Sequence, residues 1–364
     1  MKIIQLSKYY PPAHGGLELV AEFFSRACID LGHEVKVIAL GNSTMEYEGR
    51  FGEAVFQCNE TLKFNSSPFS WSYFKRLKSL LKINPPDIIF LHLPHPFAHE
   101  ICKWFSSDLK KRNIKVVGIY HSDIINQVNL KNAYNYHFRR HLGMYDKFIS
   151  SSDELRKSSA ILSLLEKDKV KIIPFCIDNK NFKRSSRNSE NFSGRFLSIG
   201  RMVPYKGFEF LVDSFKSSPY TLTIIGDGPL LKQLKDKAGP NVTFVGNVNE
   251  EIKYQLLDQH DALIVSSINR AEAYGMIIVE AFSMGLPVIS SDIDTGVSFL
   301  VREGKTGLKF PVNDKEMILK QMDRLAKDSS FRKKISENCL EFYSKELNYE
   351  AFRKNIDNHL ASLC

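Results

Sequence analysis

The stretch EAYGMIIVEAFSMGLPVIS, residues 272–290, decides the fold. A strand-like segment, DALIVSS (261–267), comes before it, and a second one, LPVISS (286–291), overlaps its end. The β-branched residues in the middle favour a further strand. However, two neighbouring parallel strands need a crossover connection between them, which is usually a helix. We therefore predict a helix over residues 275–283 that joins two parallel strands.

The same alternation extends outward in both directions. Toward the N-terminus, short β-rich runs such as KIIQLS, HEVKVIAL and KVVGIYH alternate with helical segments, and a second series begins at RFLSIGR. This pattern predicts βαβ units and the α/β class. A polar, basic segment between the two series has the composition of an exposed linker. We expect two Rossmann-like, doubly wound parallel-sheet domains at residues 1–182 and 195–345, a linker at 183–194, and a C-terminal helix at about 346–364 that packs back onto the first domain.

The two carboxylates of the opening stretch lie on either side of the predicted helix start. Glu272 belongs to the preceding loop, and Glu280 lies more than one turn inside the helix. Eight residues of continuous helix would separate them by roughly 12 Å, so we do not expect them to share a proton. Helix N-termini bind phosphate groups. The spacing favours one carboxylate on each side of a bound phosphate, each accepting hydrogen bonds from ligand hydroxyls, although two ordinary helix charges remain the alternative.

Other residues at predicted strand ends point the same way, because ligands of doubly wound sheets bind beyond the carboxyl ends of the strands. Gly15 and Gly16 follow the first strand, and His121 follows KVVGIY. Arg201 and Lys206 follow RFLSIG and could grip a diphosphate. Taken singly, each has a plainer interpretation as a tight turn, a structural histidine or a solvated loop.

Composition limits the class of protein. With 364 residues, 43% hydrophobic and 25% charged, the chain has the size of two globular domains and no apolar run long enough to span a bilayer. Its N-terminus lacks the apolar region of a secretion signal, so we expect a cytoplasmic protein. The cysteines show no CxxC pair or metal-ligand spacing and are expected to be reduced and buried; they are Cys28, Cys58, Cys102, Cys176, Cys339 and Cys364.

The net charge of +9 is concentrated in the N-terminal half. Residues 1–200 contain 29 Lys and Arg against 19 Asp and Glu, whereas residues 201–364 contain 21 against 22. This asymmetry indicates an anionic partner for the first half, or a solvated lysine-rich surface. The segment from Trp71 to Lys82, WSYFKRLKSLLK, combines aromatic and basic residues and could lie on an anionic membrane, although its leucines equally suit a helix packed on a sheet.

Collectively, these motifs resemble the retaining glycosyltransferases of family 4, which have the GT-B fold of two Rossmann-like domains facing a cleft. The resemblance covers nearly the whole chain and is most specific in GRMVPYKG, GDGPL, VGNV and the stretch from residue 272 to 301. It implies that the C-terminal domain binds a nucleotide sugar and that the N-terminal domain binds the acceptor.

The resemblance also assigns roles to residues. Glu280 would bind the ribose, Glu272 a hydroxyl of the donor sugar, and Lys253 would lie near the base. The catalytic residues would be His121, Glu272, Arg201 and Lys206, and the donor-binding residues would be Gly15, Gly16, Arg201, Lys206, Gly246, Val248, Lys253, Glu272, Tyr274, Gly275, Met276, Ile277 and Glu280.

Two departures from the family pattern stand out, and no cofactor is expected. Tyr274 replaces the usual Phe, and Thr295-Gly296 replaces a frequent Gly-Gly pair. The sequence DID at 292–294 looks like the metal-binding DxD motif of another glycosyltransferase class, but we interpret it as a coincidence and expect metal-independent catalysis.

The layout of YHSDIINQ and IIPFCID looks like that of O-polysaccharide mannosyltransferases, which suggests a hexose donated by GDP-mannose. The expected acceptor is a polyprenyl-diphosphate-linked saccharide of O-antigen or capsule synthesis, reached by peripheral attachment to the inner face of the cytoplasmic membrane. The alternatives are a UDP-sugar donor (GlcNAc, Glc or Gal), a nucleotide-sugar 2-epimerase, and a non-catalytic sugar-binding or nucleic-acid-binding module. We expect no nucleic acid partner.

Overall fold

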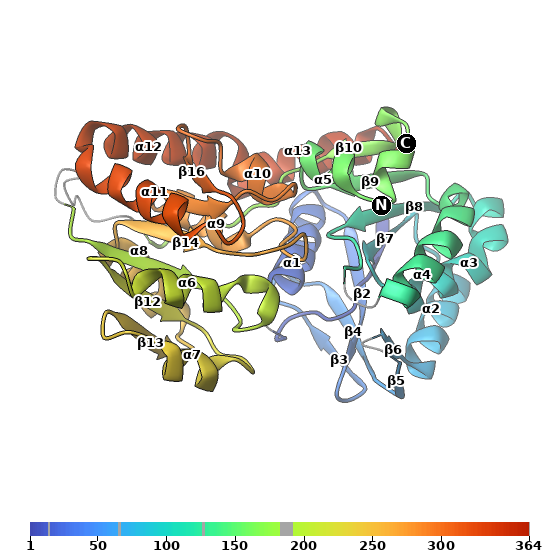
Figure 1. Ribbon diagram of the computed structural model, residues 1–364. Helices are drawn as coiled ribbons and strands as arrows, with labels where there is room; N and C mark the ends of the chain where they lie inside the picture. Colours follow the sequence, from blue (N-terminus) through green and yellow to red (C-terminus); the bar gives the residue numbers. More distant parts are fainter. Residues whose placement is uncertain (14, 65–66, 126–127, 183–191, 364) are drawn as a thin grey trace. The chain divides into compact units, whose positions relative to one another are not determined.

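The computed structural model describes residues 1–13, 15–64, 67–125, 128–182 and 192–363 (Figure 1). The chain divides into two compact units: unit 1 comprises Met1–Cys176 with Tyr349–Cys364, and unit 2 comprises Ile177–Asn348. The division falls at residue 177 rather than at 182, because Ile177 forms a β-bridge with Asn348 inside unit 2. Most of the predicted linker, residues 183–191, lies outside the described residues.

Unit 1 is built on an eight-stranded sheet with the order β10-β9-β8-β7-β1-β2-β4-β3. All neighbours are parallel except β3 and β4, and the hairpin β5-β6 forms a separate small sheet. The strands are β1 (Lys2–Leu6), β2 (Glu34–Gly41), β3 (Met45–Glu48), β4 (Ala54–Asn59), β5 (Leu62–Phe64), β6 (Ser67–Phe69), β7 (Ile88–Leu93), β8 (Lys115–Tyr120), β9 (Lys147–Ser150) and β10 (Val170–Ile172).

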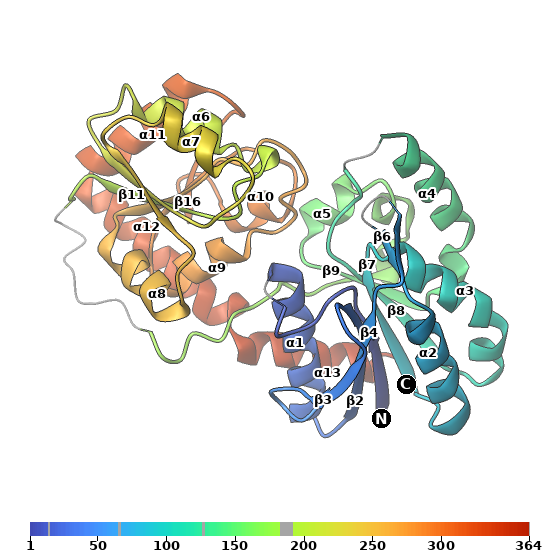
Figure 2. The same cartoon turned by 90° about the horizontal axis from the view of Figure 1, so that it is seen from below.

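The helices of unit 1 are α1 (Gly16–Asp30), α2 (Trp71–Ile83), α3 (Pro96–Lys111), α4 (Val128–Arg140), α5 (Asp153–Ser158) and α13 (Tyr349–Ala361). The last of these belongs to unit 1 although it follows unit 2 in sequence, and it lies beside α1 in both Figure 1 and Figure 2. The ring of Phe352 meets that of Phe24 at 5.0 Å, and the Tyr349 hydroxyl donates to Asp30. Aromatic burial thus holds α13 on α1.

Unit 2 contains a six-stranded, fully parallel sheet with the order β13-β12-β11-β14-β15-β16. Its strands are β11 (Arg195–Ile199), β12 (Thr221–Ile225), β13 (Val242–Gly246), β14 (Ala262–Val265), β15 (Val288–Ser291) and β16 (Gly307–Phe310). Its helices are α6 (Phe208–Phe215), α7 (Leu231–Lys237), α8 (Glu250–Gln259), α9 (Met276–Ser283), α10 (Gly296–Leu300), α11 (Lys315–Lys327) and α12 (Ser329–Phe342).

The helix predicted at 275–283 is confirmed, since α9 occupies Met276–Ser283 between the parallel strands β14 and β15. Its β-branched residues Ile278 and Val279 are fully buried, so packing outweighs their modest helix propensity. Gly275 precedes the helix with φ of 83°, a left-handed conformation that favours glycine.

The expectation of reduced, buried cysteines is confirmed for Cys28, Cys58, Cys102, Cys176 and Cys339, which are buried thiols not joined by disulfides within the described ranges; Cys364 lies outside those ranges. Among the helices of the described ranges, none is both long and apolar enough to cross a membrane.

Unit 1 buries several histidines in the neutral form. Burial is the main cause that lowers the pKa of His95, His99 and His121 to about 3 and that of His359 to about 4. The pKa of His92 is lowered well below its ordinary value for the same reason, with the neighbouring His121 adding to the effect. In the unfolded chain these imidazoles would take up a proton near pH 6.5. Their contribution to stability is therefore complete above pH 6.5 and is lost as the pH falls toward 3 to 4.

We predict that unit 1 loses stability under mildly acidic conditions. Each such histidine is expected to lower the free energy of unfolding by about 1.4 kcal/mol for every pH unit below pH 6.5. Both tryptophans, Trp71 and Trp104, belong to unit 1, so tryptophan fluorescence during urea unfolding reports on that unit. The urea concentration at the midpoint of the fluorescence change should be markedly lower at pH 5 than at pH 7.

The matched variant is His359→Leu, which removes one buried imidazole whose Nε2 has no hydrogen-bond partner among the described residues. It should flatten the pH dependence of the fluorescence midpoint. A midpoint that does not change with pH in the unaltered protein would contradict the neutral burial of these histidines.

Candidate functional site

The carboxyl end of the unit 2 sheet gathers most of the predicted site residues. The strand order reverses between β11 and β14, which is where open parallel sheets bind their ligands. Arg201 and Lys206 follow β11, and Glu272 lies in the connection between β14 and α9. Two segments far apart in sequence thus meet at this switch point.

An ion pair between Lys206 and Glu272 joins these two segments. Glu272 is 8% exposed, and its Oε2 also accepts a hydrogen bond from the Ser267 hydroxyl at 2.9 Å. Burial lowers the pKa of the Lys206 ammonium, but the attraction of Glu272 outweighs that effect, so the pKa is raised overall. The lysine therefore stays charged beside a carboxylate that retains little contact with solvent.

A second ion pair joins Glu280 on α9 to Lys253 on α8, with 2.7 Å between Nζ and Oε2. Glu280 is also 8% exposed. Burial raises the pKa of its carboxyl group, and Lys253 opposes that rise. Because Glu272 and Glu280 have different lysine partners, they belong to two separate ion pairs.

An open depression of about 660 Å³ lies beside these pairs, at the ends of β11, β12 and β13. Its floor depends on Gly226, whose φ is 126° and where a Cβ would come within 2.2 Å of the Gly200 carbonyl oxygen. The depression is lined by Ile199, Gly200, Arg201, Ile225, Gly226, Asp227, Gly228, Asn247, Val248 and Lys253. The structure thus places three predicted residues, Arg201, Val248 and Lys253, on one surface.

The first turn of α9 presents backbone groups at the same end of the sheet. Met276 and Ile277 are partly exposed, and the first N–H groups of a helix have no partner within it. Tyr274 is buried just ahead of them, and a Cβ on Gly296 would come within 2.5 Å of its ring. The Thr295 hydroxyl accepts a hydrogen bond from Val297 N–H at the start of α10, so threonine is accommodated at the position where the family often has glycine.

Gly246 contributes to the turn rather than to the depression. Its carbonyl accepts a hydrogen bond from Gly226 N–H at 2.9 Å, and its φ is 80°. The next residues, Asn247 and Val248, line the depression instead. Asn247 and Asp227 were not predicted as site residues, because a polar residue in a glycine-rich turn is an ordinary turn feature.

In unit 1, the carboxyl end of the sheet holds Gly15, Gly16 and His121. Helix α1 begins at Gly16, directly after Gly15, at the position predicted for a helix N-terminus. His121 follows β8 and is 4% exposed.

His121 is one member of a buried polar chain that sequence reasoning missed. One of its ring nitrogens, Nε2, lies 2.8 Å from Nδ1 of His92, and His92 Nε2 lies 2.7 Å from Oε1 of Gln5. The Gln5 amide nitrogen donates to Ser25, which orients the Gln5 oxygen toward His92. His92 Nε2 therefore donates to Gln5, and His121 Nε2 donates to His92.

This orientation leaves Nδ1 of His121 with an acceptor lone pair and no partner among the described residues. The pKa of His121 is lowered to about 3 by burial, so the ring is neutral at physiological pH. A neutral imidazole with its donor already engaged can accept a hydrogen bond from a ligand hydroxyl.

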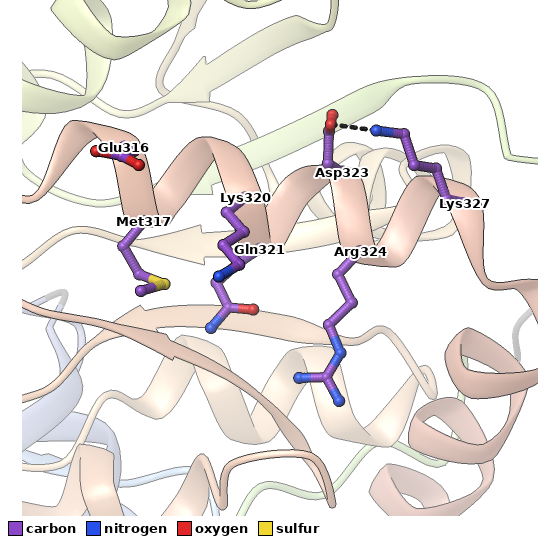
Figure 3. Close-up of a pocket in the computed structure, with 7 residues that line it drawn as sticks. All are labelled: Glu316, Met317, Lys320, Gln321, Asp323, Arg324 and Lys327. Carbon is purple, nitrogen blue, oxygen red and sulfur yellow. Dashed lines mark hydrogen bonds and ion pairs between the residues drawn. The ribbon is translucent and has the colours of Figure 1, made fainter.

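A hollow of about 700 Å³ along α11 is unrelated to this site. Figure 3 shows Glu316, Lys320 and Arg324 along α11. On the same helix Asp323 and Lys327 form an ion pair, with 2.5 Å between oxygen and nitrogen. An ion pair between residues four apart is an ordinary feature of a solvated helix face. We therefore do not interpret this hollow as a ligand site.

Comparison with known proteins identifies two family models that lie end to end. Residues 14–181 match the model described as Glycosyltransferase Family 4, and residues 178–341 match the model described as Glycosyl transferases group 1. The chain is 29% identical to O-antigen chain mannosyltransferase C of Escherichia coli, over 93% of this chain and 92% of the relative. It is also 29% identical to D-rhamnosyltransferase WbpZ of Pseudomonas aeruginosa, over 85% of this chain and 83% of the relative.

Solved structures show the same fold. Sucrose-phosphate synthase from Thermosynechococcus elongatus superposes with a TM-score of 0.80 at 18% identity, covering 100% of this chain and 99% of the other. Anabaena Alr3699/HepE in complex with UDP superposes with a TM-score of 0.76 at 18% identity over the full length of both chains. The predicted fold class, two Rossmann-like domains of the GT-B type, is confirmed.

Proposed function

Because this chain belongs to the glycosyl transferases of group 1, with a family 4 module in its N-terminal part, we propose that it is a retaining hexosyltransferase. The proposed donor is GDP-mannose, and the proposed acceptor is a polyprenyl-diphosphate-linked saccharide in the synthesis of O-antigen or capsule. The observation that carries the proposal is the pair of buried carboxylate–lysine contacts on either side of the α9 N-terminus.

The proposed reaction breaks the bond between the anomeric carbon and the diphosphate oxygen. Negative charge grows on the departing diphosphate, and Arg201, Lys206 and the first N–H groups of α9 would stabilise it. The acceptor hydroxyl attacks from the face that the diphosphate leaves, and its proton passes to a departing phosphate oxygen. No side chain then has to act as a strong base.

Each carboxylate has a distinct proposed role. Glu272 would accept hydrogen bonds from hydroxyls of the donor sugar, while Lys206 would turn from Glu272 toward the diphosphate. Glu280 would accept hydrogen bonds from the ribose, with Lys253 and Val248 beside the base. Both carboxylates are paired with lysines at the end of the sheet. When the donor binds, its hydroxyl groups would replace these lysine contacts, so the carboxylates would keep polar partners throughout.

On the acceptor side, we propose that Gly15 and Gly16 let the N-terminus of α1 approach the transferring sugar. The unpartnered Nδ1 of His121 would accept a hydrogen bond from a hydroxyl of that sugar. Its neutral state fits a binding role rather than transfer of a proton.

We propose that the reaction needs no metal ion or cofactor. Asp292 of the DID sequence is already paired with Lys309 at 3.0 Å, which fits a surface ion pair better than a metal ligand. Arg201 and Lys206 supply the positive charge that a metal would otherwise provide.

The relatives named above as a mannosyltransferase and a D-rhamnosyltransferase support mannose or a related hexose as the transferred sugar. A UDP-sugar donor is the second candidate, favoured by the fold neighbour that binds UDP. The 2-epimerase and the non-catalytic module have less support, because an epimerase needs an acid/base cluster and a module does not explain the paired carboxylates.

We also propose peripheral attachment to the inner face of the cytoplasmic membrane through unit 1. The leucines of α2 do not face outward: Leu77, Leu80 and Leu81 are buried against the sheet. The surface instead displays Trp71, Ile83 and Trp104, which are 55%, 78% and 71% exposed. Their neighbours on α2 include the exposed lysines Lys75, Lys78 and Lys82, a combination suited to an anionic lipid surface.

The two carboxylates should respond differently to removal. Glu280→Ala is expected to weaken GDP binding by about 10- to 100-fold, because the lost contacts are charged and buried. Glu272→Ala is expected to lower kcat by about 100-fold with a smaller effect on GDP binding. Isothermal titration and transfer kinetics separate the two effects, and Glu316→Ala, an exposed carboxylate on α11, is the matched control. If Glu272→Ala keeps full turnover and the same donor preference, its proposed role is wrong.

Slow hydrolysis of a panel of nucleotide sugars tests the donor. GDP-mannose should be hydrolysed at least about tenfold faster than UDP-glucose, UDP-galactose or UDP-GlcNAc, with no change on adding EDTA. A preference for a UDP-sugar would show that the proposed donor is wrong, but it would still agree with a glycosyltransferase. Hydrolysis of none of them, together with salt-sensitive DNA binding, would favour the binding module.

Flotation with lipid vesicles tests membrane attachment. The protein should bind vesicles containing phosphatidylglycerol and not vesicles of phosphatidylcholine alone, and salt should weaken binding. The double variant Trp71→Ala/Trp104→Ala should bind these vesicles at least about tenfold more weakly than the unaltered protein. Leu164→Ala, another exposed apolar residue of unit 1, is the control and should bind normally. Equal binding by the double variant would exclude this surface.

A further inference from the structure

Three imidazoles converge in unit 1 where α3 meets the end of α4. His99 lies on α3, His137 lies in the last turn of α4, and His141 follows that helix directly. One ring nitrogen from each lies within 4.8 Å of the others. The ring of His99 meets those of His137 and Phe138, which places this part of α3 against the end of α4. None of these histidines belongs to the proposed donor site.

His99 has the environment of a prepared metal ligand. Its side chain is fully buried and stacks on Phe138, with ring centroids 4.5 Å apart. Its Nδ1 lies 2.8 Å from the Tyr145 hydroxyl, whereas its Nε2 has no hydrogen-bond partner among the described residues. A buried polar atom without a partner is costly, and a metal ion would satisfy it. When Nδ1–H of His99 donates a hydrogen bond to the Tyr145 hydroxyl oxygen, the lone pair of Nε2 is available, which is the usual arrangement around a ligating histidine.

His137 and His141 add two ligands from one helical face, because residues four apart lie on the same side. The ring of His141 is oriented by Nδ1, which lies 2.8 Å from the backbone carbonyl of His137. Glu100, adjacent to His99, contacts His137 Nε2 and could supply a fourth, oxygen ligand. Lys103 opposes a cation here, since its ammonium lies 3.1 Å from Glu100 and 3.4 Å from His137 Nε2.

We propose that His99, His137 and His141, with Glu100 as the fourth ligand, bind a divalent transition-metal ion of the zinc type. Three imidazoles and one carboxylate suit zinc, whereas calcium and magnesium prefer oxygen ligands. The ion would link α3 to the end of α4 and stabilise unit 1 without taking part in sugar transfer.

The test is a zinc titration of the full-length chain, free of a histidine tag and stripped with EDTA. We expect one equivalent of Zn²⁺ per chain with Kd in the micromolar range or tighter, and a visible absorption band when Co²⁺ is used instead. The variant His137→Gln/His141→Gln should bind at least about 100-fold more weakly. His33→Gln, a partly exposed histidine elsewhere in unit 1, should bind normally. Lys103→Met should bind more tightly, because it removes the competing cation.

Thermal unfolding gives the second measurement. Zinc should raise the unfolding midpoint of the unaltered protein and not that of the double variant, because a ligand stabilises only the state that binds it. His137 and His141 are partly exposed, so the double variant should fold normally in EDTA, as circular dichroism would verify. The proposal is overturned if the unaltered chain binds no zinc in this range, or if the double variant binds it with the same affinity and stoichiometry.

Discussion

The reversal of strand order between β11 and β14 is the constraint on which the candidate site depends. At this point the connections leaving the two strands turn to opposite faces of the sheet, so their first residues are left side by side at its carboxyl edge. The Lys206–Glu272 ion pair closes that junction, and the Lys253–Glu280 pair lies beyond it on α8 and α9. Both pairs place opposite charges at the same edge of the sheet.

Much of this arrangement was predictable because its signals are local. The alternation of strand-like and helical segments was enough to predict the α/β class, and the crossover argument correctly placed a helix at residues 275–283 against its β-branched composition. Residues directly after predicted strands led to Arg201, Lys206 and Glu272. Strand ends in a parallel sheet share one edge, so position along the chain translates into position in space.

What could not be predicted depends on contacts between distant residues. His92 lies within the apolar run IIFLHL and has the appearance of a core residue, and its link to Gln5 and His121 exists only once β1, β7 and β8 are neighbours. The cluster of His99, His137 and His141 likewise depends on the packing of α3 on α4. The leucines of the segment from Trp71 to Lys82 left two orientations open, and only the packed sheet shows that they face inward.

The placement of α13 also governs the order in which the chain can fold during synthesis. The helix covers Phe24 of α1, whose ring in turn meets His92 at 5.7 Å, yet it is made after all of unit 2. Unit 2 is contiguous in sequence and can complete its own sheet as soon as it leaves the ribosome. Unit 1, although translated first, must wait with an uncovered aromatic surface until the last helix arrives. Unit 1 therefore completes its packing only after all of unit 2 has been synthesised.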